Sequence, residues 1–384
     1  MLQKRRGIEE KVNSFVTSNI EKGYYSGSQV LVSHKGEKLV DLNNGYMINN
    51  SNDPSEKVTT DTLFNIESIT KVMAPLPLAF GLIQNGKLNL EDKVVDFLPE
   101  FGTSKDKKNV TIRDMLNFTA GISLADPPGT AKAALEGNQN RAWDLHYSVE
   151  LEFEPGSKVF YSDVSCRIFG KLIERVLGKD LSSASQEMIF EPLGMEDTMF
   201  NPPDKGRCAA TGVSDKGRIL RGELTQDLEH YMGEILGSDG LFSNAHDMLI
   251  FSEMLLNGGI YNGKRILSER TVEKMIYDIS NEDVYEKPSS YLHFILSGPK
   301  VWYWEYAHSP YSFFGDLVSD KAIGKMGGAG TFLLIDPEYD LIIIYLTNYG
   351  QPEPTLAGDE AWNKFQREIN MMGLCNLIIG NLPT

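Results

Sequence analysis

Cysteine is scarce in this chain of 384 residues, and long hydrophobic runs are missing. The three cysteines, Cys166, Cys208 and Cys375, are odd in number and far apart, which argues against a disulfide framework and a zinc-ligand cluster. No run of about 18 apolar residues occurs, so we expect no membrane-spanning helix. The chain as given shows no secretory signal, so we expect a cytoplasmic protein. An exported form whose leader was removed is the alternative.

Positive charge is in the minority. The chain has 37 Lys and Arg against 53 Asp and Glu, a formal net charge of −16. Nucleic acids and anionic membranes are bound by basic surfaces, so we expect neither as a partner. The histidines never show a metal-binding spacing, and no phosphate-binding glycine loop or Gly-x-Ser-x-Gly pattern is present. We therefore expect no metal and no cofactor, and the sequence does not indicate the oligomeric state.

Strand patterns lie near the two ends of the chain, and helical patterns dominate between them. The expected strands cover 29–33, 38–42, 331–335 and 341–347. We expect an α/β (α+β) fold in which residues 1–98 and 236–384 build a sheet with helices, and residues 99–235 form an inserted, mainly helical domain. A cleft between two such lobes is a usual place for a small-molecule site.

Helical periodicity predicts several helices around this sheet. They cover 8–20, 68–84, 112–118, 165–176 and 361–379. Pro75 lies inside the second of them, so that helix is either kinked there or begins later.

The first chemical signal is Ser68-Ile69-Thr70-Lys71. A serine hydroxyl needs a base beside it, and a lysine three residues further along a helix lies on the same face. The apolar stretch that follows predicts a buried Lys71, and burial favours the neutral amine. The same spacing occurs at Ser104/Lys107 and at Ser297/Lys300, so this motif alone leaves a structural reading equally open.

Two further patterns follow in order along the chain. Tyr161-Ser162-Asp163 stands at a turn before a helix, where Ser162 or Asp163 could also serve as a helix cap. Lys325-Met326-Gly327 is followed by Gly328 and an apolar strand. Glycine there lets a ligand approach the backbone, or it marks a bulge beside a solvated lysine. Together the three patterns supply a nucleophile, a proton-handling pair and a cationic anchor.

With these motifs in this order, the chain resembles the serine β-lactamase and penicillin-binding-protein superfamily, in the branch of class C β-lactamases, DD-peptidases and related esterases. The resemblance extends over about 27–349. Further stretches that look like the family are 111–116, 154–157, 189–195, 240–243 and 335–341. The resemblance implies a β-lactamase-like fold with an antiparallel sheet flanked by helices, and an active site between the sheet domain and the helical domain.

The resemblance also implies catalytic roles. Ser68 would attack the carbonyl carbon and carry the acyl group. Lys71 and Tyr161 would share its proton and pass it to the leaving group. The backbone N–H groups of Ser68 and Gly328 would form the oxyanion hole.

For substrate binding, the resemblance points to Asp163, Lys325, Gly327 and Gly328. Asp163 stands where the family often has an asparagine that touches the substrate's amide side chain. Lys325 would support the proton network and hold a substrate carboxylate. Phe118 replaces a histidine that is frequent in the family, at a position expected to be structural.

The implied activity is hydrolysis of a small-molecule ester, amide or β-lactam through an acyl-enzyme, without a cofactor. A penicillin-binding DD-peptidase or an acyltransferase would use the same residues. An alternative of another class is a non-catalytic binding module on this fold. Its recognition surface would be the aromatic stretch 301–306, which equally suits core or cleft lining.

Overall fold

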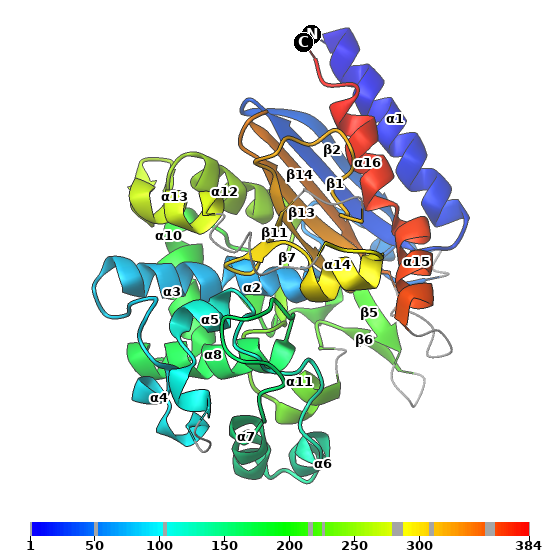
Figure 1. The fold of residues 1–384 in the computed structure, drawn as a ribbon. Coiled ribbons are helices and arrows are strands. Elements are labelled where there is room, and N and C mark those ends of the chain that lie inside the picture. Colours follow the sequence, from blue (N-terminus) through cyan, green and yellow to red (C-terminus); the bar gives the residue numbers. More distant parts are fainter. Residues whose placement is uncertain are drawn as a thin grey trace.

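A seven-stranded antiparallel sheet forms the centre of the computed structural model, in the order β10-β11-β12-β13-β14-β1-β2 (Figure 1). The structure describes residues 2–49, 53–102, 106–213, 218–224, 227–278, 287–306, 311–349 and 358–383. The strands are β1 (Gly27–His34), β2 (Glu37–Gly45), β10 (Lys300–Val301), β11 (Trp304–Tyr306), β12 (Ile323–Gly327), β13 (Thr331–Asp336) and β14 (Leu341–Thr347). All four predicted strands are present, and the predicted fold class is confirmed.

Both ends of the chain cover one face of this sheet. Helix α1 (Leu2–Glu21) lies beside α15 (Gly358–Ile369) and α16 (Met371–Ile379), as the blue and red helices of Figure 1 show. Val12 of α1 and Leu374 of α16 share one core with Val30 and Ile343 of the sheet. Because helices pack on both faces, β1, β13 and β14 are buried at every residue.

The predicted helix 8–20 is present within α1, but the predicted helix 361–379 is two helices. Asn370 separates α15 from α16 with a left-handed backbone, φ 51°. Asparagine tolerates this conformation, and the Asn370 side chain accepts a hydrogen bond from the Gly373 N–H at the start of α16.

The other face of the sheet packs on α12 (Ala245–Leu256), which contacts β1 and β14. The turn at Glu67–Ile69, which contacts β12 and β13, leads into α2 (Thr70–Met73) and then α3 (Pro75–Gln84). Ala74 interrupts the predicted helix 68–84 with φ −118° and ψ −76°, so that Pro75 starts a new helix. This break agrees with the expectation from proline, which cannot continue a helical hydrogen-bond ladder.

Further helices and strands complete the fold. The helices are α4 (Val94–Phe97), α5 (Ile112–Leu116), α6 (Thr130–Leu135), α7 (Gln139–Tyr147), α8 (Asp163–Leu177), α9 (Leu181–Ser185), α10 (Glu191–Leu193), α11 (Asp227–Met232), α13 (Glu269–Tyr277) and α14 (Tyr291–Ser297), and α8 is the longest of them. The strands are β3 (Phe64–Asn65), β4 (Met199–Phe200), β5 (Ala210–Val213), β6 (Ile219–Arg221), β7 (Leu241–Ser243), β8 (Ile260–Tyr261) and β9 (Lys264–Arg265). The division into 1–98 with 236–384 and 99–235 stays a prediction.

The aromatic stretch 301–306 is buried throughout. Trp302 and Tyr303 form the two-residue turn between β10 and β11, and both have positive φ, 51° and 69°. Large side chains rarely adopt this conformation, and here the surroundings hold it. The Trp302 N–H donates to Asn117 Oδ1 (3.0 Å), and the Tyr303 N–H donates to Leu116 O (2.9 Å). The aromatic side chains of the stretch are therefore part of the core.

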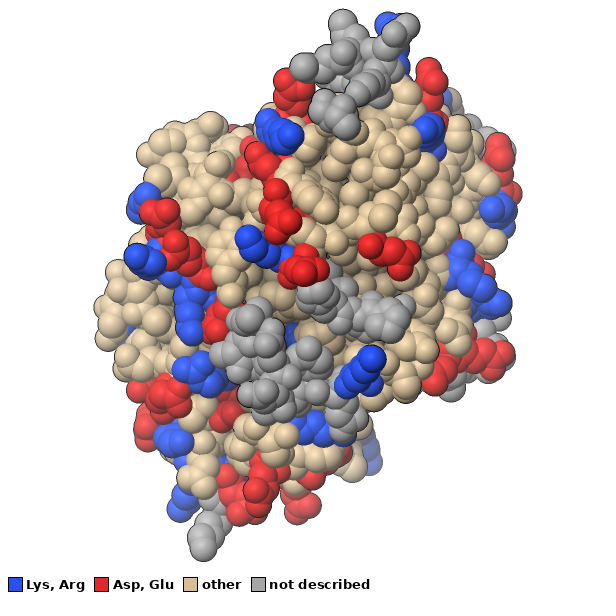
Figure 2. All heavy atoms as spheres, turned by 45° about the horizontal axis from the view of Figure 1, so that its top comes forward, with Lys and Arg blue, Asp and Glu red and all other residues tan. Residues whose placement is uncertain are grey.

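Charges on the molecular surface are mixed. On the face shown in Figure 2, basic and acidic side chains are interspersed over broad uncharged areas. Within the residues that the structure describes, no helix combines the length and the apolar character needed to cross a membrane.

Candidate active site

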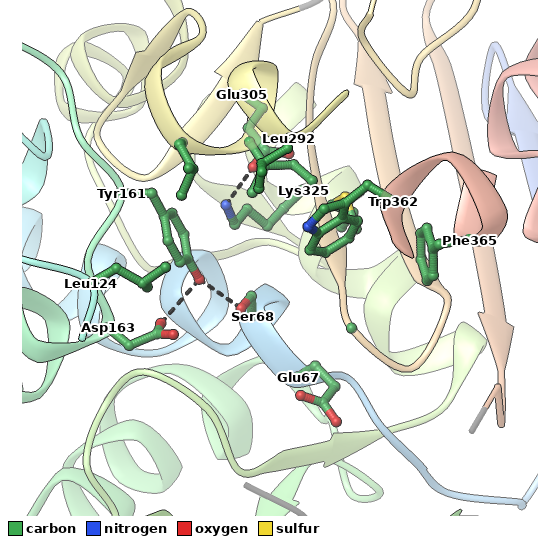
Figure 3. Close-up of a pocket in the computed structure, with 14 residues that line it drawn as sticks. Glu67, Ser68, Leu124, Tyr161, Asp163, Leu292, Glu305, Lys325, Trp362 and Phe365 are labelled. Atoms are coloured by element: carbon green, nitrogen blue, oxygen red, sulfur yellow. Dashed lines mark hydrogen bonds and ion pairs between the residues drawn. The ribbon is translucent and has the colours of Figure 1, made fainter. Parts of the chain in front are cut away.

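A pocket of about 270 Å³ opens where three parts of the fold meet: the start of α2, the end of β12 and the start of α8. Ser68, Tyr161, Asp163, Lys325 and Gly328 all line it (Figure 3). The structure thus brings together residues that are up to 260 positions apart in the sequence.

Ser68 is presented by a tight turn before α2. The preceding Glu67 is 2% exposed and has a positive φ of 51°. The Glu67 N–H donates to Asn65 Oδ1 at 3.0 Å, which helps to hold this conformation. Backbone strain of this kind persists where the surroundings enforce it, and it often occurs at functional sites. The turn leaves Ser68 half-buried at the pocket wall.

Lys71 lies one turn further on and points back to the serine, as the spacing predicted. Its Nζ donates to Ser68 Oγ (3.0 Å) and to Ser238 O (2.6 Å), and lies 2.7 Å from Asp163 Oδ1. Three acceptors around one nitrogen match the three N–H bonds of an ammonium group.

The expectation that burial would free Lys71 of its proton is wrong. Burial does lower the pKa of Lys71, but the carboxylate of Asp163, with Tyr161 nearby, outweighs it and holds the pKa well above its usual value. In the same way, burial opposes ionisation of Asp163, yet Lys71 and Arg167 bring the pKa of this carboxyl below its usual value. The resting site therefore contains a buried ammonium–carboxylate pair.

Tyr161 connects the serine with this pair. Its Oη lies 2.8 Å from Ser68 Oγ and donates to Asp163 Oδ1 at 3.0 Å (Figure 3). Burial, followed by the Asp163 carboxylate, holds the pKa of Tyr161 well above its usual value, so the phenol is neutral. Ser68 can then donate to Tyr161 while Tyr161 donates to Asp163.

Ser162, beside Tyr161, is the residue that caps helix α8. Ser162 Oγ accepts a hydrogen bond from the Ser165 N–H at 3.0 Å and caps α8. Asp163 is therefore available to the pocket. Phe118, 1% exposed, packs its ring 4.9 Å from that of Tyr161, which fits the structural position expected for it.

Lys325 lies on the opposite side of the pocket, on β12. Its Nζ is 2.7 Å from Oε1 of Glu305 on the adjacent strand β11, and the two side chains are 1% and 2% exposed. The Nζ also lies 5.0 Å above the centre of the Tyr161 ring. The prediction that Lys325 holds a substrate carboxylate stays a prediction.

The two glycines after Lys325 have different surroundings. A Cβ on Gly327 would lie 2.6 Å from Ile66 O and 2.8 Å from Glu67 Cβ, so glycine is needed for β12 to approach the turn that presents the serine. Gly328 is on the pocket wall, where a Cβ would meet only Glu67 Oε2, at 3.8 Å. Gly327 therefore allows close packing behind the pocket wall, whereas Gly328 forms part of the wall surface.

Two carboxylates of the pocket, those of Glu67 and Glu305, were not predicted from the sequence. A single acidic residue inside the aromatic stretch 301–306 was a signal for Glu305, because a buried charge needs a partner. The sequence has no signal for the left-handed backbone of Glu67. Apolar lining from α14 and α15, such as Leu292 and Trp362, was also missed.

Of the two other Ser-x-x-Lys pairs, the structure describes Ser297/Lys300, where the lysine lies in a different setting. Lys300 Nζ donates to Phe294 O at 2.7 Å. Ser104 lies outside the described residues. In the part of the chain that the structure describes, no group of three or more His, Cys, Asp or Glu side chains could hold a metal ion.

Comparisons with known proteins show the family to which the chain belongs. The model of the Beta-lactamase family matches residues 12–366. A putative D-alanyl-D-alanine carboxypeptidase of Escherichia coli (strain K12) is 32% identical over 318 residues, covering 76% of this chain and 70% of the relative. An N-acetylmuramyl-L-alanine amidase of Bacillus subtilis (strain 168) is 30% identical over 335 residues, covering 81% and 73%.

Solved structures share the fold over nearly the whole chain. EstCE1, a hydrolase with promiscuous acyltransferase activity, superimposes with a TM-score of 0.70 at 20% identity, covering 99% of this chain and 98% of that one. A penicillin-binding protein homologue from Caulobacter crescentus gives 0.68 at 20% identity, covering 99% and 97%. The predicted family is confirmed: this chain belongs to the β-lactamase family.

Proposed function

We propose that this chain is a serine hydrolase that forms an acyl-enzyme on Ser68 and cleaves esters or amides, β-lactams included. The observation that carries the proposal is the position of Ser68 Oγ, within hydrogen-bond distance of both Lys71 Nζ (3.0 Å) and Tyr161 Oη (2.8 Å). Acyl transfer requires a nucleophile bonded to a group that can take its proton, here Tyr161, and the ammonium group of Lys71 beside it stabilises the developing charge. The names of the carboxypeptidase, the amidase and EstCE1 support the same chemistry.

In acylation, Ser68 Oγ forms a bond to the substrate carbonyl carbon. Its proton moves to Tyr161 Oη as the tyrosine proton shifts towards Asp163 Oδ1, along contacts of 2.8 and 3.0 Å. The ammonium group of Lys71 keeps its protons and stabilises the negative charge that develops on Oγ. In this mechanism Tyr161 accepts the serine proton and passes its own to Asp163, and Lys71 is not the base.

The tetrahedral intermediate then collapses. The bond from the carbonyl carbon to the leaving group breaks, and the leaving group takes the proton back along Asp163 and Tyr161. We assign the oxyanion hole to the backbone N–H groups of Ser68 and Gly328, two residues that line the same pocket.

In deacylation, a water molecule forms the new bond to the acyl carbon and gives its proton to Tyr161. The bond between Ser68 Oγ and the acyl carbon breaks, and Oγ recovers a proton through the same relay. An amine or alcohol in place of water would give acyl transfer, so the fate of the acyl group depends on the acceptor that reaches the pocket.

The first test is intact mass after mixing the protein with p-nitrophenyl hexanoate, a penicillin and a fluorophosphonate. We expect a covalent adduct on Ser68 or release of product, and a loss of at least about 10³-fold in turnover in Ser68→Ala. Ser297→Ala is the matched control, because it removes the serine of another Ser-x-x-Lys pair. Equal activity in Ser68→Ala and the unchanged protein would contradict the proposal. Absence of any adduct or turnover would favour a binding module.

A further inference from the structure

We infer that, among the substrates of the proposed function, the Glu305–Lys325 pair favours an uncharged acyl donor with an apolar chain and disfavours acyl groups that carry a carboxylate, such as that of a penicillin. This inference rests on the proposed function. It concerns the substrate class of the same pocket, and it opposes the prediction that Lys325 anchors a substrate carboxylate.

The first observation is that Lys325 already has an anion. Its Nζ lies 2.7 Å from Glu305 Oε1, and both side chains are almost completely buried. A substrate carboxylate at Lys325 would have to displace Glu305 or lie beside it. Displacement separates the buried carboxylate of Glu305 from the ammonium group of Lys325, and proximity places two like charges together, so both are unfavourable.

The second observation is the balance of charge around the pocket. Three carboxylates line it, on Glu67, Asp163 and Glu305, against the single ammonium group of Lys325. Lys71, behind the wall, is paired with Asp163 at 2.7 Å. The field in the pocket is therefore neutral to negative, which does not attract an anionic substrate.

The third observation is the chemistry of the remaining wall. Helix α14, helix α15, strand β12 and the segment before α6 supply hydrocarbon and aromatic surface. These side chains are Leu124, Leu292, Ile295, Met326, Trp362 and Phe365 (Figure 3). A wall of this kind buries an apolar acyl chain, and burial of apolar area is the main source of affinity for small molecules.

Glu305 itself could be thought to attract an ammonium group. Among the described residues its Oε2 atom is buried without a hydrogen-bond partner. However, the ammonium group of Lys325 on the neighbouring oxygen repels a second cation, and the wall around it is apolar. We therefore expect an ammonium-bearing acyl group to be disfavoured as well.

The experiment compares three p-nitrophenyl esters with the same leaving group and a six-carbon acyl chain: the hexanoate, the adipate monoester and the 6-aminohexanoate. For the unchanged protein we expect kcat/KM for the hexanoate to exceed that for the adipate by about tenfold or more, since one charged hydrogen bond is worth roughly that factor. Glu305→Gln frees Lys325, so the adipate-to-hexanoate ratio should rise by about tenfold.

Lys325→Met is the complementary variant, because it leaves the charge of Glu305 alone. Here the 6-aminohexanoate-to-hexanoate ratio should rise, whereas the adipate ratio should not. Ratios within one variant cancel any general loss of activity, and thermal unfolding verifies that each variant is folded.

Distinct outcomes overturn distinct statements. A preference of the unchanged protein for the adipate or the 6-aminohexanoate overturns the inference. An unchanged adipate ratio in folded Glu305→Gln overturns the role of Glu305. No turnover of any ester, with no adduct on Ser68, overturns the proposed function instead.

Discussion

Two lysine–carboxylate pairs lie at the pocket, with the same separation and different surroundings. Lys71 Nζ lies 2.7 Å from Asp163 Oδ1, and Lys325 Nζ lies 2.7 Å from Glu305 Oε1. The first pair is hydrogen-bonded to Ser68 and Tyr161. In the second pair, the contact with Tyr161 is between Lys325 Nζ and the face of the aromatic ring.

The two pairs carry the same charges, so the difference in their proposed roles comes from the hydrogen bonds that each pair makes with its neighbours. Asp163 holds Lys71 charged and accepts from Tyr161, so the first pair is connected to the atom that reacts. Glu305 neutralises a cation at the wall, so the second pair acts on what is bound. The following variants change the first pair and its tyrosine, the second pair, or Lys300 beside the second pair.

Tyr161→Phe should have the largest effect. It keeps the ring, and with it the packing on Phe118, but removes the hydroxyl between Ser68 and Asp163. We expect acylation by p-nitrophenyl hexanoate to slow by about 10³-fold, within the range for loss of a general acid–base group. Stopped-flow release of p-nitrophenol measures this rate, and a nearly unchanged rate would mean that another group takes the serine proton.

Asp163→Asn should lower kcat/KM for the hexanoate by about 10²-fold, because Tyr161 loses the acceptor for its proton. Burial would then lower the pKa of Lys71 with less opposition, so an alkaline limb should appear in the pH profile. Glu305→Gln makes the same carboxylate-to-amide change in the other pair, and its loss should be smaller. A faster Asp163→Asn enzyme at neutral pH would show that neutral Lys71 is the base.

The same variant should also lose stability. Removing one partner of a buried ion pair costs about 3 kcal/mol of unfolding free energy. The pKa of Asp163 is lowered in the folded protein, so its contribution is present above the unfolded pKa and disappears as the pH falls through the folded value. Urea unfolding at neutral and acidic pH should therefore show a difference between the two proteins that shrinks in acid.

Lys300→Met should have the smallest effect on activity. It should, however, change how the free energy of unfolding depends on pH. Burial, reinforced by Lys325 and opposed by Glu305, lowers the pKa of Lys300 from 10.5 to about 7. The unfolded chain then binds more protons between these values, so the unfolding free energy of the unchanged protein should rise from pH 7 to 10.5. Lys300→Met should flatten this rise, and an identical slope in both proteins would contradict a neutral buried amine.

Much of the fold could be predicted from local patterns. The strands 331–335 and 341–347 follow from apolar residues around a turn, and the break at Pro75 follows from the chemistry of proline. The order of the three motifs also predicted which side chains would meet. Localisation, which no structural feature tests, stays a prediction.

The remaining features depend on contacts that sequence patterns do not contain. Asn370 breaks a continuous apolar pattern because a left-handed residue suits the corner between α15 and α16. Glu305 reaches Lys325 only through the pairing of β11 with β12, 20 residues apart. The direction of Asp163, towards Lys71, depends on Ser162 taking the cap of α8.

The two outer strands of the sheet also bear on how the protein behaves when it is concentrated. An open strand edge can pair with another molecule and begin aggregation. Strand β10 has only two residues, and the turn that follows it is buried. The other outer strand, β2, begins with exposed Glu37 and Lys38, and charges on an edge disfavour such pairing. Both borders of the sheet thus disfavour self-association through strand pairing, and replacing these two charges by valine is the change we would expect to promote it.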